Sequence, residues 1–379
     1  MTRGRAEPAR GRAEPVVEAT VTWSQVLRWR MSRQLLDGPK ARTAVTAARR
    51  LCGVHAQVAA SAVTALDLRL AGGITSEQVD DALNRRRTLV RTWAARGTLH
   101  LLPAADLPTW VAAMSTRTRE TKGAWLRYHG VTAAQMTDIL AAIPDVLGDE
   151  PLTRQELTEA IVKATGHHDL SEALNQGFGA LLKPAAFRGL LCSGPPRGRN
   201  VTFVAPRPWL GGAWPDVPTD EAIDTLILAH LGTYGPADFG EFSRWFDLNP
   251  PLARKAFARL ADAQRIAYVD VDGATGAVPR AELAGLTGTA PPDPARPSVH
   301  LLPAFDPYVV GSTRQLPHLM PAAHVKAVSR PQGWISPTLV VAGRIAGTWE
   351  RDGDRVTITP FGELPAPVRA GLPEGWRTG

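Results

Sequence analysis

The chain has 379 residues, of which 44% are hydrophobic and 21% charged, which is the composition of a globular protein with room for two or three domains. No stretch approaches the roughly 18 uninterrupted apolar residues of a membrane span, and the N-terminus lacks the apolar core of a secretion signal. Two cysteines are too few for a disulfide framework or a four-cysteine zinc site. We therefore expect a cytoplasmic protein without a membrane anchor.

The net charge of +7 is unevenly distributed along the chain. Residues 19–66 carry seven basic side chains and one acidic one, residues 82–105 carry five arginines and no acid, and residues 173–215 carry five basic residues and no acid. These segments together carry +16, so the remainder carries −9. Such sorting is typical of proteins that bind nucleic acid. The alternative is an excess of surface arginine imposed by GC-rich codons.

The N-terminal third predicts a leader followed by helices and a ribbon. Residues 1–20 contain GRAEP twice and are rich in Arg, Pro and Glu, so we expect a disordered leader. Residues 21–110 are expected to form a first winged helix. Its helices are predicted over 23–36, 42–52, 57–71 and 76–86, and its two-stranded ribbon over 89–103, with a turn at Ala95-Arg96-Gly97.

The same order of helices and ribbon recurs twice. Residues 111–215 would form a second winged helix, in which Thr153 and Glu156 make a capping box, a helix covers 171–189 and a hairpin covers 190–206. Residues 216–290 would form a third, with a strand over 265–273. Residues 295–379 alternate in strand fashion. We therefore expect an α+β fold of three tandem winged-helix modules forming a concave basic surface, plus a small C-terminal β domain.

Most sequence signatures of catalysis are missing from the chain. It contains no Gly-rich phosphate loop, no GxSxG elbow, no HExxH and no paired Cys/His set with metal spacing. His167-His168-Asp169 resembles a metal motif only superficially, since adjacent side chains diverge and Asp169 or Ser171 is better explained as a helix cap. We expect neither a metal nor a cofactor.

One short segment has a spacing that suits chemistry. In RRLCGVHAQVAASAVTALDLRL (49–70), Gly53 ends one helix, and the next begins near Gln57 or Val58. His55 and Gln57 would then lie in an extended link, where residues two apart face the same side. Both could face one ligand there. The alternative is that the two side chains merely cap helix ends.

Three segments resemble a known family in the same order and over roughly residues 21–360. GVHAQ (53–57), RTWAARGTLHLLPAAD (91–106) and GWISPTLVVAGRIAGTWER (333–351) are similar to the AlkZ/YcaQ-type winged-helix DNA glycosylases. In that family a Gln-apolar-Gln or Gln-apolar-Asp triplet carries catalysis. The matching positions are His55, Ala56 and Gln57, with His in place of the first Gln, as in an AlkZ-like branch found with genotoxic natural-product pathways.

The resemblance implies both an activity and a role for this triplet. It implies excision of N-alkylated purines, including bulky N7-guanine adducts, and self-resistance in antibiotic producers. Because N7-alkylation makes guanine cationic, the base leaves as a neutral molecule without a strong acid. We expect His55, with an ordinary pKa of about 6.5, to be the general base and Gln57 to position the water. The excision rate would rise with pH through that pKa and then level.

The expected partner is double-stranded DNA with alkylated purines, bound by a monomer with little sequence preference. The predicted DNA contacts are Arg33 and Arg96, together with Arg197, Arg199 and Asn200 at the hairpin tip 194–200, for which a solvated turn is the alternative. The nearest lysine in sequence is Lys40, so a Schiff-base intermediate is not expected and the glycosylase would be monofunctional. The rival function is a winged-helix transcription regulator in which His55 and Gln57 are structural.

Overall fold

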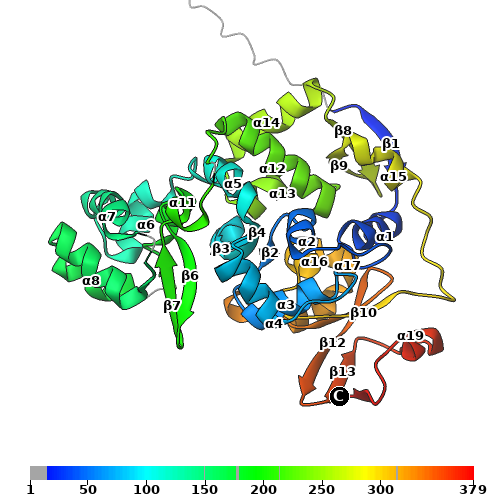
Figure 1. Cartoon of the computed structure of the whole chain (residues 1–379). Coiled ribbons are helices and arrows are strands. Elements are labelled where there is room, and N and C mark those ends of the chain that lie inside the picture. The colour runs from blue at the N-terminus through cyan, green and yellow to red at the C-terminus, as the bar shows by residue number, and fades with distance from the viewer. Residues whose placement is uncertain (1–14, 149, 176–178, 213, 313–314) are drawn as a thin grey trace, which may run out of the picture.

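The computed structural model describes residues 15–148, 150–175, 179–212, 214–312 and 315–379. Its helices and strands are intermixed along the chain, which confirms the predicted α+β class. The described strands form three three-stranded sheets and one five-stranded sheet. In Figure 1, the sheet that contains β6 (Cys192–Arg197) and β7 (Asn200–Val204) forms a lobe on the left together with its helices. The five-stranded sheet lies at the lower right, near the C-terminus.

The first sheet contains the predicted catalytic segment. Its strands are β2 (Val54–His55), β3 (Leu89–Trp93) and β4 (Leu99–Pro103), in the order β2-β4-β3. The helices beside it are α2 (Ala44–Arg50), α3 (Ala59–Asp67) and α4 (Ser76–Asp80), which continues as the π-helix η1 (Asp81–Arg85). A 3-10 turn, η2 (Ala95–Gly97), joins β3 to β4. The ribbon predicted over 89–103 is therefore confirmed.

The second sheet has the order β5-β7-β6. Its strands are β5 (Leu152–Thr153), β6 (Cys192–Arg197) and β7 (Asn200–Val204). The helices of this region are α5 (Leu107–Met114), α6 (Gly123–His129), α7 (Ala133–Val146), α8 (Arg154–Thr165), α9 (Ser171–Asn175), α10 (Lys183–Phe187) and α11 (Pro206–Leu210). The capping box of Thr153 and Glu156 at the start of α8 is confirmed, as is the hairpin.

The single helix predicted over 171–189 is wrong. The structure has α9 and α10 instead, with a turn between them; residues 176–178 lie outside the described part of the chain. Gly179 adopts a φ of +73°, a left-handed conformation that a continuous helix does not contain. A Cβ at this glycine would lie 2.7 Å from the Trp93 ring, so the close approach requires glycine and breaks the helix.

The third sheet has the order β1-β8-β9. Its strands are β1 (Val17–Val21), β8 (Ile266–Val271) and β9 (Ala274–Pro279). The helices around it are α1 (Trp23–Arg33), α12 (Thr219–Tyr234), α13 (Phe239–Phe246), α14 (Pro250–Asp262) and α15 (Leu283–Thr287).

The predicted disordered leader is wrong for residues 17–20, and residues 1–14 lie outside the described chain. Residues 17–20 belong to β1, which runs parallel to β8 and buries Val21 against Val269 and Val271. We call each of the first three sheets, with the helices beside it, a unit. Helix α1 does not belong to the first unit, because Val26 and Trp29 pack with the third sheet.

The C-terminal region combines a sheet with short helices. The sheet order is β10-β11-β12-β13-β14, formed by β10 (Val299–Leu302), β11 (Thr338–Val341), β12 (Arg344–Asp352), β13 (Arg355–Pro360) and β14 (Arg377–Thr378). The α-helices are α16 (Pro307–Val310), α17 (Leu316–Leu319), α18 (Val325–Val328) and α19 (Ala366–Ala370). The strands agree with the predicted β domain, but the segment between β10 and β11 is largely helical, so the domain is mixed.

The first three units share one order of elements. The first two each have a helix, a short strand, further helices and a two-stranded ribbon, and the short strand pairs with the last ribbon strand: β2 with β4, and β5 with β7. In the third unit a single bridge between Ala237 and Ala277 takes the place of the short strand.

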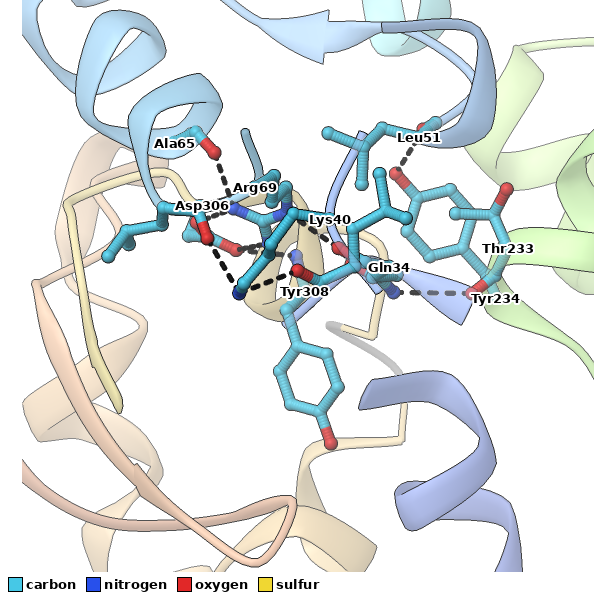
Figure 2. Close-up of polar contacts among 11 residues, drawn as sticks. Gln34, Lys40, Leu51, Ala65, Arg69, Thr233, Tyr234, Asp306 and Tyr308 are labelled. Atoms are coloured by element: carbon cyan, nitrogen blue, oxygen red, sulfur yellow. Dashed lines mark hydrogen bonds and ion pairs between the residues drawn. The ribbon is translucent and has the colours of Figure 1, made fainter. Parts of the chain in front are cut away.

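Buried polar contacts join the N-terminal helices to the C-terminal region (Figure 2). The Arg69 guanidinium forms a fully buried ion pair with Asp306, with N···O distances of 2.8 and 2.9 Å. Arg69 also donates to the main-chain oxygens of Gln34 and Ala65. The segment around Asp306 is therefore fixed against the first unit.

Candidate active site

His55 lies in β2, opposite His100 of β4. Gly53, with a φ of +90°, ends the preceding turn, and α3 begins only at Ala59, so the predicted extended link is present. The side chain of Ala56 lines an apolar cavity of about 320 Å³ that Leu101 also lines. Since side chains alternate in an extended segment, His55 and Gln57 lie on the opposite side from Ala56.

The His55 imidazole is enclosed by aromatic rings. Its centroid lies 5.0 Å from that of Phe305 in a stacked arrangement, and 5.5 Å from that of His100 in an edge-on one. Only 6% of the residue is exposed. The Nδ1 atom is buried without a hydrogen-bond partner among the described residues. The site therefore combines the first unit with a residue 250 positions later in the chain.

Burial changes the acid–base character of this histidine. Desolvation, together with the neighbouring His100 and Arg96, lowers the pKa of His55 to about 3, and desolvation is the largest of these causes. Burial likewise lowers the pKa of His100 to about 4. His55 is therefore a neutral imidazole at any physiological pH. The rise in rate that we predicted from an ordinary pKa of about 6.5 is not expected for the free enzyme.

Gln57 is exposed at the end of the same link. Its Oε1 accepts from the Leu99 main-chain N–H at 3.5 Å, which is at the limit of a hydrogen bond. The backbone beside it is better anchored, because Ala56 donates to the Leu99 oxygen at 2.7 Å and accepts from Arg91 at 3.1 Å. A fixed backbone thus presents an amide that a ligand can engage.

Arg96 is placed close to this site. It occupies the turn η2 with a φ of +56°, and its charge contributes to the lowered pKa of both His55 and His100. Its Nη1 donates to the Val310 oxygen at 3.4 Å. Two cavities, of about 340 and 620 Å³, are both lined by Arg96 and Arg119. Of the predicted DNA contacts, Arg96 is the one that the structure places beside His55.

Sequence reasoning missed the basic and aromatic lining of the larger cavity. Arg119, Lys122 and Lys183 line it together with Tyr128, which is 85% exposed. Basic groups beside an exposed aromatic ring are typical of nucleic-acid surfaces. The local signal is the short run KGAWLRYH (122–129), which places basic and large aromatic residues close together in the sequence.

Three of the predicted DNA contacts, Arg197, Arg199 and Asn200, lie at the hairpin tip and are exposed. Arg197 forms an ion pair with Glu156 at 2.6 Å and donates to the Pro151 oxygen at 2.5 Å. Arg199 makes no hydrogen bond or ion pair with the described residues, and Asn200 pairs with Arg197 across the hairpin. The side chain of Arg199 is thus the one most available to a ligand.

Arg33 is used inside the protein. Its side chain is only 16% exposed, pairs with Glu282 at 2.7 Å and donates to the Gly232 oxygen at 2.9 Å. It lines two cavities that Arg96 does not line. The structure therefore gives Arg33 a role in joining α1 to the third unit, and it remains only a prediction as a DNA contact.

The described residues contain no cluster of three or more His, Cys, Asp or Glu side chains placed to hold a metal ion. His167 instead pairs with Asp138 at 2.8 Å, and Asp169 accepts from Gln135 at 2.9 Å. Within the same residues, no helix combines the length and apolar character needed to cross a bilayer.

Arg96 thus links the neutral His55 imidazole to a cavity with a basic and aromatic lining. The chain matches the family described as DNA glycosylase AlkZ-like over residues 48–375. It is 37% identical over 358 residues to an interstrand DNA cross-link repair glycosylase of Streptomyces sahachiroi, covering 92% of this chain and 93% of that protein.

Comparison of structures agrees with comparison of sequences. The fold matches Streptomyces sahachiroi DNA glycosylase AlkZ with a TM-score of 0.84 and 36% identity, over 92% of this chain and 94% of that one. The chain therefore belongs to the AlkZ-like DNA glycosylase family, which confirms the resemblance seen in the sequence. It is a DNA glycosylase, an enzyme of DNA repair.

Proposed function

We propose that the enzyme is a monofunctional glycosylase that hydrolyses the N-glycosidic bond of N7-alkylguanine and related bulky alkyl-purines. The observation that carries this proposal is the neutral His55 imidazole, whose titratable and charged neighbours are His100 and Arg96 rather than a carboxylate. A site of this kind cannot protonate a leaving base efficiently. It suits a base that already carries a positive charge and therefore leaves as a neutral molecule.

His55 and Gln57 would act after the glycosidic bond has begun to break. The Gln57 carbonyl oxygen orients a water molecule towards the sugar carbon, and the unprotonated nitrogen of the neutral His55 imidazole accepts a proton from that water. A base with a pKa of about 3 is weak. However, water that is bonding to an oxocarbenium carbon becomes strongly acidic, so a weakly basic imidazole is sufficient for this step.

The repeated element order supports three winged-helix modules, and the basic residues around the two cavities supply phosphate contacts. Arg96, Arg119, Lys122 and Lys183 lie on these cavities, and Arg199 lies at the exposed hairpin tip. Contacts of this type bind duplex DNA with little sequence preference. The logarithm of the affinity should fall with the logarithm of the salt concentration, with a slope of about −0.9 for each phosphate contact.

The proposal is tested with a duplex oligonucleotide that contains one N7-methylguanine. Under single-turnover conditions, abasic sites are revealed by strand cleavage in hot alkali. His55→Ala and Gln57→Ala should each slow excision by about 10²–10⁴-fold with DNA affinity nearly unchanged. Excision by both variants at the wild-type rate would contradict the assignment of the site.

The same assay without alkali tests the monofunctional mechanism. Lys40, the lysine nearest to the triplet in sequence, donates to the main-chain oxygens of Leu35, Leu36 and Leu68. It is therefore committed to a structural role and does not act as a nucleophile. The strand should stay intact until alkali is added, and no DNA adduct should be trapped by borohydride.

The natural lesion is addressed by a second substrate. One similar protein is named as an interstrand DNA cross-link repair glycosylase. We extend the proposal to bulky N7-guanine adducts formed by a DNA-alkylating natural product, and to self-resistance against that product. Expression of the enzyme in a sensitive bacterium should raise survival under such an agent, and expression of His55→Ala should not.

A further inference from the structure

We propose that Phe305 is a positioning residue for the excision reaction: its ring, carried by the C-terminal region, holds the His55 imidazole in its working orientation. This inference rests on the proposed function, since it assigns a purpose to the surroundings of His55. It makes the C-terminal region a part of the active site.

The geometry is that of an aromatic series running from the buried site to the surface. The His55 and Phe305 rings are nearly parallel, with an interplanar angle of 10° and centroids 5.0 Å apart. Trp334 contacts the Phe305 ring edge-on, with an interplanar angle of 76° and centroids 4.9 Å apart, and it is 43% exposed. Phe305 is therefore held between an exposed indole and the imidazole.

His55 needs such a support because it lacks the usual one. A histidine that acts through one ring nitrogen is commonly oriented by a hydrogen bond to the other nitrogen. Here Nδ1 is buried and has no partner among the described residues. Ring contacts with Phe305 and His100 are therefore what define the plane of the imidazole.

The backbone at Phe305 is unusual in a way that the surroundings enforce. Its φ is +58°, a left-handed conformation that bulky residues rarely adopt and that persists where neighbouring structure dictates it. Asp306, the next residue, is fully buried, is paired with Arg69 and accepts from the Tyr308 main-chain N–H at 2.9 Å (Figure 2). This anchor sets the direction in which the phenyl ring points.

The test uses a substitution that suits this backbone. Phe305→Gly removes the ring, and glycine adopts a φ of +58° without strain, so the fold is protected. Phe305→Tyr keeps a ring that can stack. Phe361→Ala is the matched control, because Phe361 stacks on His324 with centroids 4.2 Å apart, outside the proposed site. Phe305→Leu, which keeps apolar volume, replaces the glycine variant if that variant does not fold.

Two measurements are made on each variant: the single-turnover excision rate on N7-methylguanine DNA, and the NMR titration of the His55 ring. Loss of the phenyl ring should slow excision by about 10–100-fold, as expected for a misplaced catalytic group. In Phe305→Gly, water should also reach the imidazole and raise the pKa of His55 into the measurable range, while His100 and Arg96 still act on it. An acid limb should then appear in its pH–rate profile.

Phe305→Tyr should restore the rate to within a few-fold of wild type, and Phe361→Ala should leave both measurements unchanged. A ring-deleted variant that excises within twofold of wild type would overturn the inference. An equal loss of rate in Phe361→Ala would also overturn it, because the effect would then be general. His55→Ala separates the two proposals. If it is fully active, the catalytic role proposed for His55 fails; if it is slow while the Phe305 variants are fast, only the present inference fails.

Discussion

Replacing Arg69 with methionine should strongly destabilise the protein, because the substitution leaves the Asp306 carboxylate buried without its counter-ion. Both side chains are fully buried, and Arg69 makes four hydrogen bonds: two to this carboxylate and one each to the main-chain oxygens of Gln34 and Ala65. In the variant, the carboxylate keeps the Tyr308 main-chain N–H. Breaking a buried pair from one side costs about 3–5 kcal/mol of unfolding free energy.

A double-mutant cycle identifies the source of this cost. Urea unfolding is measured for Arg69→Met, Asp306→Asn and the double variant at pH 7.5. Asparagine removes the charge but keeps an acceptor for the Tyr308 N–H, so the double variant should lose at least about 1 kcal/mol less than the two single variants added together. A cost below 1 kcal/mol for Arg69→Met, or strict additivity, would refute the view that the pair fixes the C-terminal region to the first unit.

Two further predictions concern pH and DNA. Burial lowers the pKa to about 3, 4 and 3 in three histidines: His55, His100 and His230. The folded protein thus binds fewer protons than the unfolded chain below pH 6.5. The free energy of unfolding is therefore full above pH 6.5 and falls as the pH is lowered, by about 2 kcal/mol per histidine at pH 5. Equal urea midpoints at pH 7.5 and 5 would contradict this. Arg199→Ala should weaken binding of duplex DNA more than Arg197→Ala, because the Arg197 side chain is already held by Glu156. Neither substitution should lower the melting temperature. Equal Kd values for both variants and the wild type would show that the hairpin tip is a solvated turn without DNA contacts.

The sequence predicted those parts of the fold that local signals determine. The ribbon at 89–103 follows from two apolar runs around a turn, and the start of α8 follows from the Thr153 and Glu156 pair. It could not predict β1, because a five-residue strand is stabilised only by its partner β8, about 250 residues away. Nor could it predict the break at Gly179, which depends on contact with Trp93.

The site divides in the same way. The extended link at His55 follows from Gly53, which ends the preceding turn. Its φ is +90°, and a Cβ added at this position would lie 2.9 Å from the Leu102 side chain, so the position requires glycine. Phe305 and Trp334 come from the far end of the chain, and no local pattern connects them with the link. The lowered pKa of His55 follows from this enclosure, so it could not be inferred from residue type.

Under the proposed function, the enclosure gives a physical reason why His55 can stand where the family that the sequence resembles has a glutamine. In the proposed reaction the N7-alkylguanine and the oxocarbenium ion are both cationic, so a protonated imidazole would repel them, whereas a glutamine amide is neutral at every pH. Burial that lowers the pKa of His55 to about 3 keeps the ring neutral in the same way, with a lone pair to offer. The ring is a weaker base than a free imidazole, but its charge does not change over the physiological pH range. The kcat/KM of the wild-type enzyme should therefore show no limb from His55 between pH 5 and 8, and a limb near 6.5 would show that the enclosure opens before DNA binds.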